Sequence, residues 1–292
     1  MSVGIYRIGD ANITIEKPDG MRMPLNMQKF EILDADGLDM HMKYHLVFTD
    51  DILQVKKNFE EKRISGKEAV RETLRVFQTS EGECRVIYLA GEMVPYAVSL
   101  ATETDECQIW IDEQCKEWLK LDTVFAAMLS LEKLMIRRDA MILHSAYMCY
   151  KDTAVLFSAP SQMGKSTQAS LWEKYRQTRT INGDRTLLMR DEAGWMAYGW
   201  PVCGSSGICH NESYPIRAIV ILRQAKENRI YPLKGIKALR EVLEQITVNG
   251  WDSDFQIRAL DNIEKLLNEV PVYLLECDIS EEAVECLEKI IM

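Results

Sequence analysis

Alternation of apolar and polar residues marks the first part of this 292-residue chain. Residues 38–46 read LDMHMKYHL and alternate without a break, which predicts a half-buried strand. Residues 50–78 fit a loop, a helix or a strand. Shorter apolar runs between turn residues predict further strands at 3–8, 12–16, 84–89, 96–100 and 107–111. We therefore expect a β-rich N-terminal domain over residues 1–120.

Helical spacing becomes frequent in the second part of the chain. Residues 121–135 carry apolar side chains three and four positions apart, which predicts one amphipathic helix leading from one domain to the other. After it, strands are predicted at 140–148, 154–157, 218–222 and 271–277, and helices at 236–246, 254–268 and from an N-cap Ser280 onward. This irregular alternation predicts a mixed sheet flanked by helices over residues 121–292, and an α+β fold for the whole chain.

Charge and composition narrow the range of partners. Asp and Glu outnumber Lys and Arg by 45 to 35, and the net charge of −10 argues against nucleic acid or an anionic membrane as partner. The eight cysteines form no C-x-x-C pair, and several lie in apolar runs, as reduced thiols do. No secretory leader or membrane-length apolar stretch is recognisable, so we expect a cytoplasmic protein.

Residues 153–167, TAVLFSAPSQMGKST, carry the strongest chemical signal. An apolar run predicts a buried strand, a turn follows, and GKST opens a helical pattern, which is the layout of a phosphate-binding loop. Backbone amides at a helix N-terminus favour an anion such as the triphosphate of ATP. Lys165 would contact the β- and γ-phosphates, and Ser166 would be a Mg²⁺ ligand. The predicted nucleotide-binding residues are Ser161, Gln162, Met163, Gly164, Lys165, Ser166 and Thr167.

One position departs from the consensus G-x-x-x-x-G-K-[ST], because Ala159 replaces the first glycine. Alanine fits there only if its φ stays negative. The alternative interpretation is a chance GKS on a surface turn, which the strand before it and the helix after it both disfavour.

His144 and Asp184 are candidates outside the loop. His144 lies in predicted strand 140–148, and a hairpin with the phosphate-loop strand would bring it near the loop; the alternative is a core histidine bonded to backbone. Asp184 follows Asn182 and Gly183 in a tight turn or a bulge. A carboxylate at a strand end can ligate Mg²⁺ directly or through water, and the alternative is a plain turn aspartate.

Two other groups of residues suggest zinc only superficially. Residues 199–212 form a long Gly/Ser-rich loop, typical of an active-site cover or of a merely mobile segment. Its Cys203, Cys209 and His210 fit no common zinc spacing. His41 and His45 would suggest zinc on a helix, but the alternation around them predicts a strand.

The stretch from His144 to the C-terminus resembles the kinase domain of bacterial HPr kinase/phosphorylase and its relatives from lasso-peptide and similar peptide-maturation clusters. The matching motifs are LHSA at 143–146, the loop 158–167, LW at 171–172, GDR at 183–185, GWP at 199–201 with Gly204, IRAIVIL at 216–222 and AL at 238–239. The resemblance implies a fold similar to phosphoenolpyruvate carboxykinase. It also implies ATP- and Mg²⁺-dependent phosphorylation of a serine or threonine hydroxyl on a protein or peptide.

Position by position, the resemblance implies catalytic roles for His144, Lys165 and Asp184, with Ser166 and Asp184 as Mg²⁺ ligands. Gly183 stands where the family has the first of two aspartates, so Asp184 must combine tasks or His144 must act as base. The acidic stretch typical of true HPr kinases is absent, so HPr is not the expected acceptor. Relatives assemble, so a homo-oligomer is a further expectation.

Two alternatives to a serine kinase stay open at the level of sequence. Loss of the first aspartate at Gly183 could leave a nucleotide-binding scaffold that regulates or recruits a partner. The second alternative is a small-molecule kinase of carboxykinase-like fold.

Overall fold

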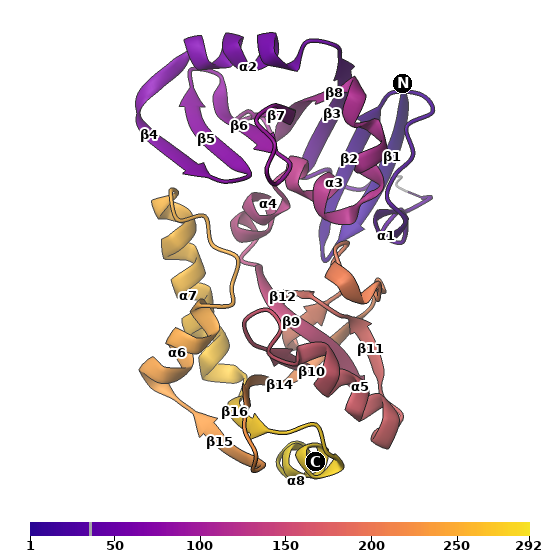
Figure 1. Cartoon of the computed structure of the whole chain (residues 1–292), viewed down its shortest axis with the longest axis vertical. Helices are drawn as coiled ribbons and strands as arrows, with labels where there is room; N and C mark the ends of the chain where they lie inside the picture. The colour runs from indigo at the N-terminus through magenta and orange to yellow at the C-terminus, as the bar shows by residue number, and fades with distance from the viewer. Residues whose placement is uncertain (35–36) are drawn as a thin grey trace. The chain divides into compact units, whose positions relative to one another are not determined.

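The computed structural model describes residues 1–34 and 37–292, with the backbone alone at 65–67. The chain divides into two compact units, Met1–Leu134 and Met135–Met292 (Figure 1). This division falls later in the chain than the expected boundary after residue 120. The single helix expected over 121–135 is wrong, because Ser130 takes a left-handed backbone conformation (φ 53°) between α3 (Asp122–Leu129) and α4 (Leu131–Arg137).

Within the described residues, the first unit is built on an eight-stranded mixed sheet. The strand order is β1-β2-β3-β8-β7-β6-β5-β4, in which β3 runs parallel to both β2 and β8. The strands are β1 (Ser2–Ile8), β2 (Ala11–Lys17), β3 (Met42–Thr49), β4 (Arg63–Arg71), β5 (Leu74–Thr79), β6 (Gly82–Tyr88), β7 (Pro95–Ala101) and β8 (Glu106–Asp112). The prediction of a β-rich first part is confirmed.

The ambiguous residues 50–78 contain both a helix and strands. Helix α2 (Ile52–Glu61) begins at Asp51, whose carboxylate accepts a hydrogen bond from the Gln54 amide, and β4 and β5 follow it. Its buried Ile52 and Phe59 pack in one apolar cluster with sheet residues such as Val86. The unit also contains α1 (Leu25–Gln28) and the 3₁₀ helix η1 (Glu113–Lys120).

The two histidines of the alternating segment are engaged in polar contacts. His41 Nδ1 accepts a hydrogen bond from the Asn12 amide at 3.0 Å, and His45 Nδ1 lies 2.8 Å from Glu16 Oε2. The strand itself begins only at Met42, so His41 precedes it.

The second unit is a mixed sheet with helices on both faces. Its strand order is β10-β9-β12-β13-β14-β16-β15, with β11 paired to β9, and β10 also pairs with β14. Strand β14 runs parallel to β10 and to β16. The strands are β9 (Met141–Tyr150), β10 (Thr153–Ser158), β11 (Arg179–Asn182), β12 (Arg185–Asp191), β13 (Gly194–Tyr198), β14 (Ser213–Gln224), β15 (Arg229–Leu233) and β16 (Val272–Cys277).

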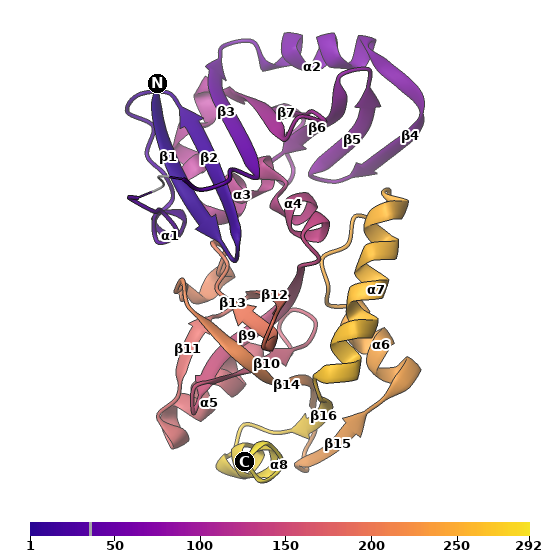
Figure 2. The ribbon, with the colours of Figure 1, turned by 180° about the vertical axis from the view of Figure 1, so that it is seen from behind.

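Strand β10 is buried on both faces and shows how the layers are joined. Ala154 and Leu156 pack toward α6 and α7, whereas Val155 and Phe157 pack toward α5 and α8. The helices are α5 (Lys165–Arg176), α6 (Gly235–Leu243), α7 (Ser253–Glu269) and α8 (Glu281–Ile291), with α6 and α7 side by side in both views (Figures 1 and 2). The predicted mixed sheet flanked by helices is confirmed.

Two details bear on expectations from composition and capping. All eight cysteines lie in the described ranges, and none forms a disulfide. None of the helices in those ranges is long and apolar enough to cross a membrane. Ser280 does occupy the N-cap position of α8, but its side chain hydrogen-bonds Asp278 instead of capping a helix amide.

Candidate functional site

The loop between β10 and α5 presents an uncapped helix N-terminus. Gly164 occupies the N-cap position with φ 99°, and no side chain caps the helix there. Gln162 also has a left-handed backbone, with φ 66°. Ala159 is not among the positive-φ residues, and its methyl group is buried in the apolar cluster with Val155 and Phe157. The first amides of α5 are therefore available to an anion, and Ala159 is compatible with the loop.

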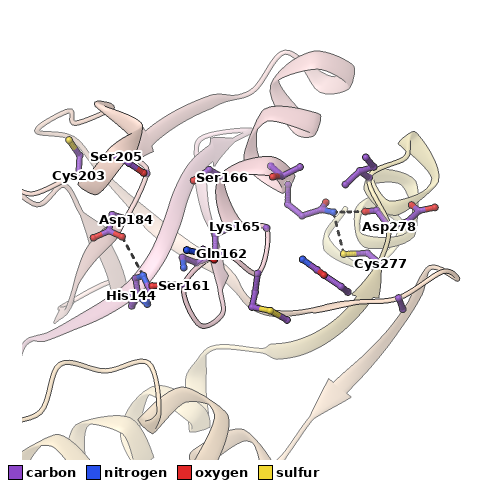
Figure 3. Close-up of a pocket in the computed structure, with 18 residues that line it drawn as sticks. His144, Ser161, Gln162, Lys165, Ser166, Asp184, Cys203, Ser205, Cys277 and Asp278 are labelled. Carbon is purple, nitrogen blue, oxygen red and sulfur yellow. Dashed lines mark hydrogen bonds and ion pairs between the residues drawn. The ribbon is translucent and has the colours of Figure 1, made fainter.

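This loop opens on a cavity of about 770 Å³. Figure 3 shows the labelled loop residues in the middle of the view, between the His144–Asp184 pair on one side and Cys277 and Asp278 on the other. All the residues predicted from sequence line it together, namely His144, Ser161, Gln162, Met163, Gly164, Lys165, Ser166, Thr167 and Asp184. The structure thus gathers the whole predicted set in one place.

Lys165 spans the loop from the first turn of α5. Its Nζ donates hydrogen bonds to the carbonyl oxygens of Ala159 at 3.0 Å and Pro160 at 3.4 Å, and the residue is only 7% exposed. Burial lowers the pKa of the Lys165 ammonium, and the nearby Asp184 carboxylate partly opposes that shift. Burial removes water from around the ammonium, and a phosphate group in the cavity would stabilise its charge in place of that water.

Asp184 is placed by a bulge, which settles the alternative between turn and bulge. Strands β11 and β12 both pair with β9, so they form one interrupted strand rather than a hairpin. The fully buried Asn182 holds the bulge: its Oδ1 accepts from the amides of Asp184 and Arg185, both at 2.9 Å. Its Nδ2 donates to the carbonyl oxygens of Trp200 and Val202.

His144 lies beside Asp184 at the start of the phosphate loop. Because β10 pairs with β9 through Ser158 and Ser145, His144 falls just beyond the end of β10. His144 Nε2 lies 3.3 Å from Asp184 Oδ1, with 21% and 26% of the two side chains exposed. The hydrogen bond to His144, together with Arg185 nearby, holds the pKa of Asp184 below its usual range. His144 therefore faces the cavity and is not a core histidine.

Gly183 is enclosed by the Gly/Ser-rich loop. A Cβ atom at this position would lie 2.0 Å from Ser206 Oγ and 2.3 Å from Ser206 Cβ. The 3₁₀ turn η2 (Gly204–Ser206) thus fills the space into which a longer side chain at Gly183 would extend. An aspartate at position 183 does not fit unless this turn moves.

Sequence reasoning missed the far side of the cavity. That side is formed by Gln168, Gln224, Ala225, Cys277, Asp278 and Ile279. Gln224 ends β14 and Cys277 ends β16, and both strands run parallel to β10 or to each other, so their carboxyl ends meet at the phosphate loop. Gln168 of α5 joins this side by donating to Cys277 Sγ at 3.2 Å and to the Asp278 carbonyl at 2.9 Å. Burial raises the pKa of the Cys277 thiol to about 11.

The donor set suits a hard cation bound together with phosphate. In the part of the chain that the structure describes, no three His, Cys, Asp or Glu side chains gather to hold a metal ion. Mg²⁺ needs fewer protein ligands, because it keeps waters and takes phosphate oxygens. Ser166 and the ionised Asp184 line the same cavity and are oxygen ligands of the kind Mg²⁺ prefers. Cys209, one of the loop residues considered above for zinc, donates its thiol hydrogen to the Trp200 carbonyl at 3.3 Å.

The fold and site define an α+β protein whose second unit places an uncapped helix N-terminus, a buried lysine and a histidine–aspartate pair around one cavity. Residues 107–292 match the model of a family described as ScmC, SynChlorMet cassette protein ScmC. The chain belongs to this family.

Curated proteins and solved structures provide two further comparisons. No curated protein matches the chain. Among solved structures, the chain is similar to one described as the Hpr(Ser) kinase/phosphatase from Coxiella burnetii, with 10% sequence identity and a TM-score of 0.32. The match covers 51% of this chain and 87% of that chain.

Proposed function

We propose that this chain is an ATP- and Mg²⁺-dependent phosphotransferase that phosphorylates a serine or threonine hydroxyl of a protein or peptide. The observation that carries the proposal is the cavity in which the first amides of α5, Lys165 and the His144–Asp184 pair meet. An anion site beside an ionised carboxylate and an imidazole is the arrangement that phosphoryl transfer to an alcohol requires. The motif resemblance to HPr kinases supports the same reaction.

The α5 end of the cavity binds the nucleotide in this proposal. The amides of Gly164 to Ser166 and the Lys165 ammonium contact the β- and γ-phosphates. Ser166 and Asp184 would hold Mg²⁺, which when bound neutralises charge on the phosphate oxygens. Lys165 exchanges its contacts with the Ala159 and Pro160 carbonyls for phosphate oxygens, which satisfy a buried ammonium better.

The His144–Asp184 pair accepts the proton of the acceptor alcohol in this proposal. The alcohol oxygen forms a bond to the γ-phosphorus, the bond from that phosphorus to the β–γ bridging oxygen breaks, and ADP leaves. The alcohol proton passes to the pair, in which Asp184 orients His144 through the 3.3 Å contact. The hydrogen bond with His144 lowers the pKa of Asp184, which keeps the carboxylate charged beside the imidazole that it orients.

Single-turnover transfer tests this function. The purified chain is mixed with ATP labelled in the γ-phosphate, Mg²⁺ and a peptide library carrying one serine, with a matched alanine library as control. Of the two libraries, only the serine library should become labelled, and this label should be lost in Lys165→Met. Lys174→Met, an exposed change on the same helix, should leave transfer unchanged. Tight binding of ATP and Mg²⁺ with no transfer to any hydroxyl would contradict the kinase and favour a nucleotide-binding scaffold.

A further inference from the structure

The short turn η2 forms one wall of the cavity next to Asp184. A Cβ atom on Gly204 would lie 3.0 Å from Asp184 Cγ, so the backbone of the turn lies directly against the catalytic carboxylate. Ser205 of this turn and Cys203, which directly precedes the turn, line the same cavity as His144. Residues on η2 are therefore within the space that an acceptor hydroxyl would enter.

The two serines of the turn differ in their contacts. Ser206 Oγ donates to the Cys203 carbonyl at 2.7 Å and accepts from the Ile208 amide at 3.2 Å, so it is committed to holding the turn. Ser205 is exposed and lines the cavity, and its hydroxyl makes no hydrogen bond within the described residues. Figure 3 shows Ser205 beside Cys203 on the side of the cavity that holds the His144–Asp184 pair.

We propose that Ser205 is a phosphate acceptor within its own chain, which rests on the proposed function. Ser205 Oγ attacks the γ-phosphorus of ATP bound at Lys165, and a Ser205–phosphate ester forms. The bond from that phosphorus to the β–γ bridging oxygen breaks, ADP leaves, and the hydroxyl proton passes to the His144–Asp184 pair. Atoms and charge balance with ATP as the only co-reactant.

The negative charge of a phosphate on Ser205 would limit further ATP binding in the same cavity. A phosphoserine carries about −1.5 to −2 at pH 7, and here it would stand in a cavity that already holds the Asp184 carboxylate. The reaction stops at one phosphate per chain because Ser205 has a single hydroxyl, and like-charge repulsion then weakens binding of the next ATP. An external serine acceptor would have to compete with Ser205 for the same space.

The test is intact-mass spectrometry of the full chain after phosphatase treatment, followed by incubation with ATP and Mg²⁺. One phosphate per chain should appear and map by fragmentation to Ser205. Its rate should be independent of chain concentration, and a tagged Lys165→Met chain mixed with wild type should stay unlabelled. Ser205→Ala should abolish the mass shift, Ser205→Thr should keep it, and Ser206→Ala should leave the label on residue 205.

Each of the other outcomes contradicts the proposal, and each shows which part of it is wrong. If the chain binds ATP and Mg²⁺ and labels the serine library, but Ser205 stays unmodified, the acceptor assignment is wrong while the kinase stands. If label appears at another residue or only on the tagged partner chain, the intramolecular step is wrong. If calorimetry detects no ATP binding, the proposed function fails together with it.

Discussion

Replacing Gly183 with alanine tests how tightly turn η2 packs against the bulge that carries Asp184. The added Cβ would lie 2.0 Å from Ser206 Oγ and 2.3 Å from Ser206 Cβ, distances that the side chains cannot tolerate. Gly183 is not among the positive-φ glycines, so alanine meets no backbone strain there. The effect of the substitution is therefore steric and local.

The magnitude follows from what Ser206 must give up. If it moves away, it loses its bonds to the Cys203 carbonyl and the Ile208 amide, at about 1 kcal/mol each. Glycine-to-alanine replacement restricts the unfolded chain and returns about 0.4–1 kcal/mol. The net loss in the free energy of unfolding is thus about 1–2 kcal/mol, or a melting temperature lower by about 2–8 °C.

The assay is urea and thermal unfolding of a double-mutant cycle. Ser206→Gly removes both clashing atoms, so Gly183→Ala should cost at least about 1 kcal/mol less in that background than in wild type. Ser206→Ala keeps the Cβ at 2.3 Å and should rescue little, which makes it the matched control. Equal stability of wild type and Gly183→Ala, or an additive cycle with Ser206→Gly, would refute the packing argument.

Three further outcomes are expected from variants in and beside the loop. Lys165→Met removes a buried ammonium whose pKa burial lowers, so the ligand-free chain should melt no lower than wild type, although its ATP affinity falls. A melting temperature several degrees lower would contradict this. Asp184 has a pKa depressed chiefly by His144, so its contribution to stability is present above the ordinary aspartate pKa of about 3.9 and is lost as pH falls through the depressed value. The gap in melting temperature between wild type and Asp184→Asn should therefore hold steady above about pH 4 and shrink as the pH falls further, and a gap that closes by about pH 5 would contradict the assignment. Ala159→Gly should cost about 1–2 kcal/mol of stability without changing ATP affinity, because the methyl packs in the core; a raised affinity would mean that the methyl obstructs the loop.

The local parts of the site were predictable from sequence. The run Ala154–Phe157, the turn and GKST are contiguous, so strand, loop and helix can be recognised from one short window. His144 could be placed because a two-residue turn, Lys151–Asp152, fixes the hairpin with the loop strand.

The nonlocal parts could not be predicted. Whether Gly183 sits in a turn or a bulge depends on β11 and β12 sharing β9, which no short window reveals. The position of turn η2 over Gly183 depends on tertiary packing. The cavity wall at Gln224 and Cys277 depends on the order of the parallel strands. The break at Ser130 was missed because the apolar spacing continues across it at helical period.

The most direct test is calorimetric titration of ATP and Mg²⁺ into the full chain, with Lys165→Met and Lys174→Met in parallel. We predict one saturable site in wild type and Lys174→Met, and affinity at least about 100-fold weaker in Lys165→Met, as expected for losing about 3 kcal/mol of charge-assisted contacts. Binding of equal affinity in Lys165→Met, or no binding by wild type, would contradict a nucleotide site at the N-terminus of α5.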